Sequence, residues 1–264
     1  MRIELSSFQS KAVNELQSRA IMAHDSYGKF HVPQVISLQA PTGSGKTVML
    51  AALIENIYYG TEDFREQHNA IFLWLSDSPA LNEQSMHKMI RHADRIMPGR
   101  CEIISDESFD RRTLDDGHIY FLNTQKIGKS GNLVRHSDMR QYTIWETIEN
   151  TANEKPGQLY FVIDEAHRGM QGRDAGKATT IMQKFIKGSP ADGLSPVPVI
   201  IGMSATADRF NALIAGTTSS TLHKVIVNPA EVRSSGLLKD RIIINYPQDS
   251  SRHNDMAVLH AAAD

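Results

Sequence analysis

Apolar positions along the chain follow two alternating patterns: short unbroken runs, and longer segments in which apolar residues recur with a helical period. The runs at 70–75 and 159–163 contain no charged residue, as expected of strands buried on both faces of a sheet. Strands are predicted at 35–39, 70–75, 101–104, 118–122, 158–163 and 197–202, and helices at 6–23, 46–59, 80–97, 138–152 and 174–187. This alternation predicts an α/β fold with a mostly parallel central sheet and helices on both faces.

The loop between the first predicted strand and the helix at 46–59 has the sequence APTGSGKT, residues 40–47. Such a loop binds phosphate because glycines let successive backbone N–H groups surround an anion, and the helix N-terminus adds partial positive charge. Lys46 supplies a charge for the outer phosphates, and the Thr47 hydroxyl is placed to hold Mg²⁺. Ala40 departs from the usual pattern, which begins with glycine. The predicted nucleotide-binding residues are Thr42, Gly43, Ser44, Gly45, Lys46 and Thr47.

Two adjacent carboxylates, Asp164 and Glu165, follow the apolar run at 159–163. In phosphoryl-transfer enzymes a strand-end aspartate holds Mg²⁺, and a neighbouring glutamate can orient and deprotonate the attacking water. Acidic residues also cap helices, so this pair alone would be a weak indication. Together with the phosphate-binding loop, it predicts Asp164 as a Mg²⁺ ligand, Glu165 as the general base and Lys46 as the third catalytic residue.

Charge and composition limit the classes of partner. The 264 residues include 28 basic and 30 acidic side chains, a formal net charge of -2, and the isoelectric point is about 6.6. This overall charge does not indicate a basic surface for binding nucleic acid. Nucleic acid is not excluded, because helix N-termini, hydroxyls and backbone amides also bind phosphates. No apolar run approaches the roughly 20 residues of a membrane span, the first residues lack a secretory-signal pattern, and a single cysteine excludes an internal disulfide. We expect no membrane association and a cytoplasmic location.

The sequence DEAH at 164–167 resembles the DEAH box of superfamily 2 helicases and translocases, and residues 40–47 resemble their motif I. Residues 203–206, MSAT, are similar to their motif III, and Gln9 resembles the upstream glutamine whose amide contacts adenine. The resemblance implies a RecA-like P-loop NTPase domain that uses ATP and Mg²⁺, with Gln9 at the adenine edge. It also implies a polar network that couples the γ-phosphate to nucleic acid, formed by His167, Ser204 and Thr206.

Motif Ia of this superfamily, which contacts nucleic acid, is similar to residues 77–84, DSPALNEQ. The segment keeps the hydroxyl of Ser78 and the amide of Gln84, but it has Pro79 where many members carry arginine. Thr124 follows another predicted strand and is a looser candidate for a strand-binding element. The resemblance therefore implies that Ser78, Gln84 and Thr124 contact nucleic acid.

Within the superfamily, residues 164–169 and 202–210 are most similar to the ATPase subunit of type III restriction enzymes, and residues 228–240 resemble that group's passage towards a second domain. Such proteins have two RecA-like domains, the second of which carries motifs IV to VI and the arginines that stabilise the transition state. No match to those later motifs is found. We therefore expect residues 1–227 to form the first RecA-like domain and residues 228–264 to lead towards a second one in a longer chain.

The resemblance implies an ATP-dependent DNA helicase or translocase of the restriction type, with double-stranded DNA as substrate and a methyltransferase subunit as a further partner. An arginine finger accelerates hydrolysis by roughly 10³–10⁵-fold, so this fragment is expected to bind ATP and hydrolyse it slowly. Two alternatives stay open: an RNA helicase of the same superfamily, and a nucleotide-dependent switch that scaffolds an assembly without moving on nucleic acid. No Pro-Asp…Glu-x-Lys nuclease cluster is evident.

The other polar and aromatic residues have structural interpretations. The 11 histidines lack the partner spacing of a zinc site. Trp74 lies inside an apolar run, and Trp145 lies in a predicted helix together with Ile144 and Ile148. Both tryptophans are therefore expected in the core.

Overall fold

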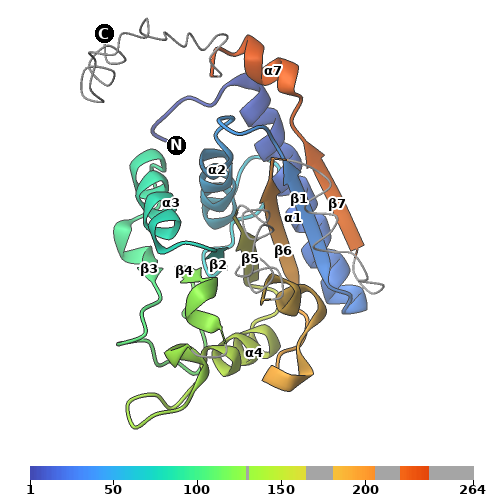
Figure 1. Ribbon diagram of the computed structural model, residues 1–264. Coiled ribbons are helices and arrows are strands. Elements are labelled where there is room, and N and C mark those ends of the chain that lie inside the picture. The colour runs from blue at the N-terminus through green and yellow to red at the C-terminus, as the bar shows by residue number, and fades with distance from the viewer. Residues whose placement is uncertain (129–130, 165–180, 206–220, 238–264) are drawn as a thin grey trace, which may run out of the picture.

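The chain forms one seven-stranded sheet with the strand order β3-β4-β2-β5-β6-β1-β7. The computed structural model describes residues 1–128, 131–164, 181–205 and 221–237 (Figure 1). All neighbouring strands in this sheet are parallel. The strands are β1 (Gln34–Gln39), β2 (Ile71–Ser76), β3 (Cys101–Ile103), β4 (Ile119–Asn123), β5 (Leu159–Ile163), β6 (Val199–Ser204) and β7 (Thr221–Ile226). The predicted α/β fold with a parallel central sheet is confirmed.

Helices lie in most of the described connections between strands, as is usual for parallel pairing, whereas residues 104–118, which connect β3 to β4, contain none. The α-helices are α1 (Ser7–Phe30), α2 (Lys46–Tyr59), α3 (Pro79–His92), α4 (Ile144–Glu154) and α7 (Pro229–Ser234), and residues 181–187 are also helical. Short 3-10 helices are η1 (Pro98–Arg100), η2 (Thr124–Ile127), η3 (Asn132–Val134) and η5 (Pro190–Asp192). Within the described residues, no helix is long and apolar enough to cross a membrane.

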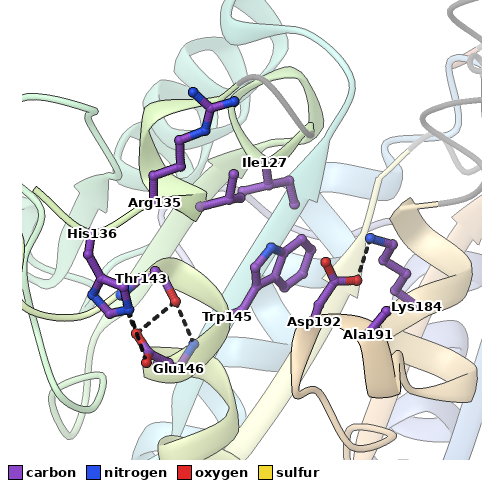
Figure 2. A pocket seen from close by; sticks show the side chains of 10 residues that line it. Ile127, Arg135, His136, Thr143, Trp145, Glu146, Lys184, Ala191 and Asp192 are labelled. Carbon is purple, nitrogen blue, oxygen red and sulfur yellow. Dashed lines mark hydrogen bonds and ion pairs between the residues drawn. The ribbon is translucent and has the colours of Figure 1, made fainter.

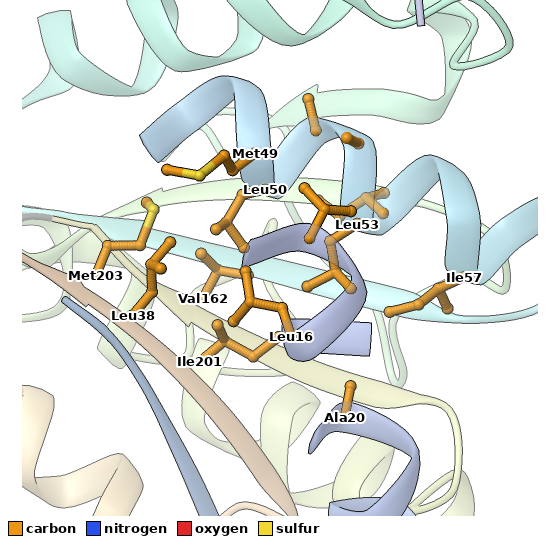
Figure 3. Packing of buried hydrophobic residues seen from close by; sticks show 14 of the residues in the cluster. Leu16, Ala20, Leu38, Met49, Leu50, Leu53, Ile57, Val162, Ile201 and Met203 are labelled. Atoms are coloured by element: carbon orange, nitrogen blue, oxygen red, sulfur yellow. The ribbon is translucent and has the colours of Figure 1, made fainter. Parts of the chain in front are cut away.

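Alternate side chains of the buried strands enter two separate hydrophobic layers. On one face, Leu38, Val162 and Ile201 pack with Leu16 of α1 and Leu53 of α2 (Figure 3). On the other face, the strands pack against α4 and the helix at 181–187, through residues that include Phe161, Ile200, Trp145, Ile148 and Phe185. Because successive side chains of a strand point to opposite faces, unbroken apolar strands fill both layers. The sheet is therefore covered on both faces, as predicted.

Several predicted boundaries were wrong, and each has a local cause. Helix α1 continues beyond residue 23 to Phe30, where His31 adopts φ 53 and donates its N–H to the carbonyl of Tyr27. Helix α3 ends at His92 instead of residue 97, because Ala93 is extended, with ψ 144. Of the helix predicted at 174–187, residues 174–180 lie outside the described residues.

Helix α4 begins at Ile144 and not at residue 138. Thr143 caps it: the Thr143 hydroxyl accepts the N–H of Glu146, and the Glu146 carboxylate accepts the N–H of Thr143. A reciprocal cap of this kind satisfies two backbone donors that the first helical turn leaves open. The sequence TIWE at 143–146 carries this signal, whereas the prediction followed the apolar period alone.

Strand β7 was not predicted, although a short apolar run was visible there. It pairs with β1 alone among the described strands, and its polar residues His223 and Lys224 interrupt the apolar run. An edge strand buries fewer side chains than a central one, so its hydrophobic signal is weaker.

Candidate nucleotide-binding site

All seven strands end at one edge of the sheet, and the predicted site residues other than Gln9 lie at or after the ends of five of them. Because the strands are parallel, the loops after β1, β6, β5, β2 and β4 emerge in that spatial order. The residues paired at this edge are Gln39–Ser204, Gly202–Ile163, Ile163–Leu75 and Ser76–Asn123. Ligands of open parallel sheets bind beyond the carboxyl ends of the strands. The two predicted ATP elements and the two predicted nucleic-acid elements therefore share one edge.

The loop between β1 and α2 depends on two glycines. Gly43 has φ 84 and Gly45 has φ 83, a left-handed conformation that residues with a Cβ rarely adopt. The loop is held from both sides: the N–H of Ala40 donates to the carbonyl of Ser204 at 3.1 Å, and the N–H of Val227 donates to the carbonyl of Gln39 at 2.8 Å. The start of the loop is therefore held between the ends of β6 and β7.

Ala40, the departure from the usual pattern, is 1% exposed and belongs to the hydrophobic layer that α1 and α2 cover. Its methyl group packs in the core at a position that does not require positive φ. The structure thus accommodates alanine where the pattern has glycine.

The loop and the start of α2 fit a phosphate group. Helix α2 begins at Lys46 and has no acidic residue in its first turn, so no side chain of that turn neutralises its partial positive charge. The Ser44 hydroxyl is buried and has no hydrogen-bond partner among the described residues. One predicted donor is already bonded, since the N–H of Ser44 donates to the carbonyl of Pro41 at 3.2 Å.

Lys46 is the first residue of α2 and is 8% exposed. Its Nζ donates to the carbonyl of Ala40 at 3.2 Å and lies 3.5 Å from the carbonyl oxygen of Pro41. These are carbonyls of the loop itself, so the ammonium group lies beside the predicted phosphate position. Thr47, the predicted Mg²⁺ ligand, is half-buried, and Thr42 and Gly43 are exposed.

Asp164 directly follows β5 and is 7% exposed. Its backbone N–H donates to the carbonyl of Leu75 at 2.9 Å, which extends the pairing of β5 with β2 by one residue. Its carboxylate Oδ2 accepts a hydrogen bond from the Ser85 hydroxyl at 3.2 Å. Ser204, at the end of β6, is fully buried. Three predicted residues, Glu165, His167 and Thr206, lie outside the described residues.

Gln9 lies at the first turn of α1 and is 7% exposed. Its Nε2 donates to the carbonyl of Ser44 at 2.9 Å, and its Oε1 accepts the backbone N–H of Ser6 at 3.1 Å. A Cβ added at Gly45 would lie 2.6 Å from this Nε2. Gln9 is therefore beside the loop at 40–47, and both ends of its amide contact the protein.

The three residues implied as nucleic-acid contacts lie after β2 and β4. Gln84 of α3 is exposed and Ser78 is half-buried, so both side chains are accessible at this edge. Thr124, the first residue of η2, is 1% exposed, whereas its neighbour Gln125 is exposed. A nucleic-acid strand bound at η2 would therefore contact the exposed side chain of Gln125 and not the buried side chain of Thr124.

Three buried polar side chains beside the site, Ser76, Asn82 and Ser85, were not predicted from the sequence. Ser76 donates its hydroxyl to Asn82 Oδ1 at 2.7 Å, and Ser85 donates to Asp164. Asn82, Ser85 and Met89 are the buried residues of α3, spaced three and four apart like the apolar face of a helix. Polar residues at positions where that period calls for apolar ones were the signal that could have identified them.

A cavity of about 520 Å³ lies between η2, η3, the start of α4 and the segment 184–192, and its lining includes none of the predicted site residues. Figure 2 shows Trp145 between the ion pair of Lys184 with Asp192 and that of His136 with Glu146. The Lys184 ammonium also lies 5.2 Å from the centre of the Trp145 ring. Trp145 is 5% exposed and Trp74 is fully buried, so both tryptophans belong to the core as predicted.

Within the described residues, no group of three or more His, Cys, Asp or Glu side chains could hold a metal ion. The described residues predicted to hold Mg²⁺ offer the Asp164 carboxylate and the Thr47 hydroxyl. Such hard oxygen donors suit Mg²⁺, which is usually bound by one or two carboxylates together with substrate phosphates and water. These residues thus fit a Mg²⁺ ion that is also bound by the phosphates of a nucleotide.

The family model described as type III restriction enzyme, res subunit, matches residues 2–209. A search of curated proteins found no match. Among solved structures 179 chains match, one of which is described as the crystal structure of the Pyrococcus furiosus Hef helicase domain. That match has 17% identity and a TM-score of 0.44, and it covers 83% of this chain and 40% of the other.

Proposed function

The chain belongs to the family of the type III restriction enzyme res subunit, and from that membership we propose that it is the ATP-binding domain of an ATP-dependent DNA helicase or translocase. The observation that carries the proposal is the arrangement at the carboxyl edge of the sheet. A phosphate-binding loop with two left-handed glycines and a buried strand-end carboxylate lie on strands separated only by β6. Nucleotide-hydrolysing enzymes use these two elements together.

The roles proposed for the individual residues are those that the resemblance to superfamily 2 helicases implies. The loop at 42–45 and the start of α2 bind the phosphates, and Lys46 neutralises their charge. Thr47 and Asp164 hold Mg²⁺, which when bound neutralises charge that develops on the transferring phosphoryl group. Glu165 orients and deprotonates the attacking water, and Gln9 lies at the adenine edge. His167, Ser204 and Thr206 link the γ-phosphate to the nucleic-acid side.

Double-stranded DNA is the proposed substrate, with Ser78, Gln84 and the segment at Thr124 as its contacts. The predicted nucleic-acid elements follow β2 and β4, adjacent to the ATP elements along the same edge. Movement on DNA requires a second RecA-like domain, and we propose residues 1–227 as the first domain and residues 228–264 as the passage towards the second. A methyltransferase subunit is a further proposed partner, and the protein acts in the cytoplasm.

The substrate is tested by ATP hydrolysis in a chain that includes both RecA-like domains, with duplex DNA, single-stranded DNA and RNA of equal length. The proposal predicts that duplex DNA raises the rate most strongly. Stimulation by RNA alone would reassign the protein to RNA remodelling. Hydrolysis that no polynucleotide stimulates would instead indicate a nucleotide-dependent switch. A Lys46→Ala variant of the same chain provides the background rate in each case.

A further inference from the structure

Ser85 and Asp164 form a buried polar contact between α3 and the end of β5. The Ser85 hydroxyl donates to Asp164 Oδ2 at 3.2 Å, across 79 residues of sequence. Ser85 is 4% exposed and Asp164 is 7% exposed. Burial of a hydroxyl and a carboxylate is unfavourable unless each is hydrogen-bonded, so the contact is one that the fold maintains and not an incidental surface pairing.

The contact restricts the carboxylate that the proposed function assigns to Mg²⁺. A hydrogen bond to Oδ2 limits rotation of the carboxylate about its Cβ–Cγ bond and so fixes the direction of Oδ1. The backbone of Asp164 is fixed as well, because its N–H donates to the carbonyl of Leu75 at 2.9 Å. Groups that hydrogen-bond to metal ligands set ligand orientation and tune metal affinity.

Helix α3 itself is held in place next to this carboxylate. The Ser76 hydroxyl at the end of β2 lies 2.7 Å from Asn82 Oδ1 and 2.9 Å from the carbonyl oxygen of Ser78. Asn82 and Ser85 lie on the same buried side of α3. The hydroxyl of Ser85 is thus presented to Asp164 from a helix anchored at its first turn.

We propose that Ser85 is a positioning residue for the Mg²⁺ site: its hydroxyl holds the Asp164 carboxylate in the orientation that binds the metal. The inference rests on the proposed function, because it takes Asp164 as the Mg²⁺ ligand. It adds a residue outside the segments whose resemblance indicated the ATP site, on the helix that begins in the candidate nucleic-acid element.

The test is the Mg²⁺ dependence of nucleotide binding, measured with a fluorescent ATP analogue from EDTA to saturating Mg²⁺. Ser85→Ala should raise the half-saturating Mg²⁺ concentration roughly tenfold and leave binding in EDTA unchanged. Ser85→Thr, which keeps the hydroxyl, should restore the wild-type dependence. The matched control is Thr151→Val in α4, which removes a fully buried hydroxyl in the layer on the opposite face.

If the wild-type chain binds ATP, either of two results would overturn the inference. One is an unchanged Mg²⁺ dependence in Ser85→Ala, and the other is an equal change in the Mg²⁺ dependence of Thr151→Val. Either would mean that Ser85 serves only the packing of α3. Thermal unfolding of each variant measures the loss of stability separately, since a purely structural role would lower the melting temperature without shifting the Mg²⁺ curve. Failure of the wild-type chain to bind ATP at any Mg²⁺ concentration would refute the proposed function itself.

Discussion

The amide of Gln9 joins the first turn of α1 to the phosphate-binding loop. Its Nε2 donates to the carbonyl of Ser44 at 2.9 Å, while its Oε1 accepts the N–H of Ser6 at 3.1 Å. One side chain therefore caps a helix and holds the loop from which Lys46 extends. This contact gives Gln9 a role in loop geometry beside the adenine contact that the resemblance implies.

Replacement of Gln9 by alanine separates these two roles. If Gln9 mainly holds the loop, Gln9→Ala weakens ATP and GTP binding by a similar factor, roughly 5–10-fold for one lost hydrogen bond. Competition titrations with both nucleotides against a fluorescent analogue measure this. Gln17→Ala is the control, because Gln17 is also buried in α1 but its Oε1 accepts from Asn56 Nδ2 instead. A loss confined to ATP would show that Gln9 acts through the base.

Gly45→Ala should destabilise the fold and weaken nucleotide binding together. Gly45 has φ 83, and a Cβ there would lie 2.6 Å from Gln9 Nε2. Strain of this kind costs about 1–3 kcal/mol of the free energy of unfolding, measurable by chemical unfolding. Gly28→Ala is the matched control, since a Cβ at Gly28 meets nothing within 4 Å and alanine favours a helix. Equal stability of the two variants would contradict the strain assigned to the loop.

The low pKa of His24 is expected to make the folded chain less stable in acid. Burial lowers the pKa of His24 from 6.5 to about 4, and the nearby Asp25 carboxylate opposes this shift. The unfolded chain therefore binds a proton below pH 6.5 that the folded chain does not bind until about pH 4. Stability falls as the pH falls through this window, by about 2 kcal/mol between pH 8 and pH 5 from this one group.

Chemical unfolding at pH 8 and pH 5 checks this, with His24→Leu as the comparison. The variant should lose less stability between the two pH values than the wild-type chain, by about the same 2 kcal/mol. An identical pH dependence in both proteins would mean that His24 does not remain neutral in the folded state.

Glu165→Gln should preserve ATP binding and stop hydrolysis. The substitution keeps the size of the side chain and removes the carboxylate that the proposed mechanism uses to activate water. Binding of a fluorescent ATP analogue and phosphate release, in a chain with both RecA-like domains, measure the two properties separately. Glu165→Gln turning over ATP at the wild-type rate would remove Glu165 from the mechanism.

The sequence predicted the parallel sheet, the loop and the family because each depends on local features. Apolar runs located β1, β2 and β5, and the order strand, APTGSGKT, helix placed Lys46 at the start of α2. The family assignment is confirmed by the model that matches residues 2–209. These signals concern neighbouring residues and therefore need no knowledge of the tertiary fold.

Contacts between distant segments could not be predicted in the same way. The pairs Gln9–Ser44 and Ser85–Asp164 join residues 35 and 79 positions apart. They form because α1 packs against β1, and because α3 packs against β2, the neighbour of β5 in the sheet. Edge strand β7 was missed for a related reason, since its pairing with β1 depends on the sheet and not on a strong apolar run. The roles of all the predicted site residues stay predictions, and three of these residues, Glu165, His167 and Thr206, lie outside the described residues.

The central claim, that the loop at 40–47 binds ATP with Mg²⁺, is tested most directly by titration of the chain with a fluorescent ATP analogue. Lys46→Ala is compared with Lys29→Ala, which removes an exposed lysine in the last turn of α1. The account predicts saturable binding by the wild-type chain and by Lys29→Ala, and none by Lys46→Ala. Tight binding by Lys46→Ala, or no binding by the wild-type chain, would contradict it.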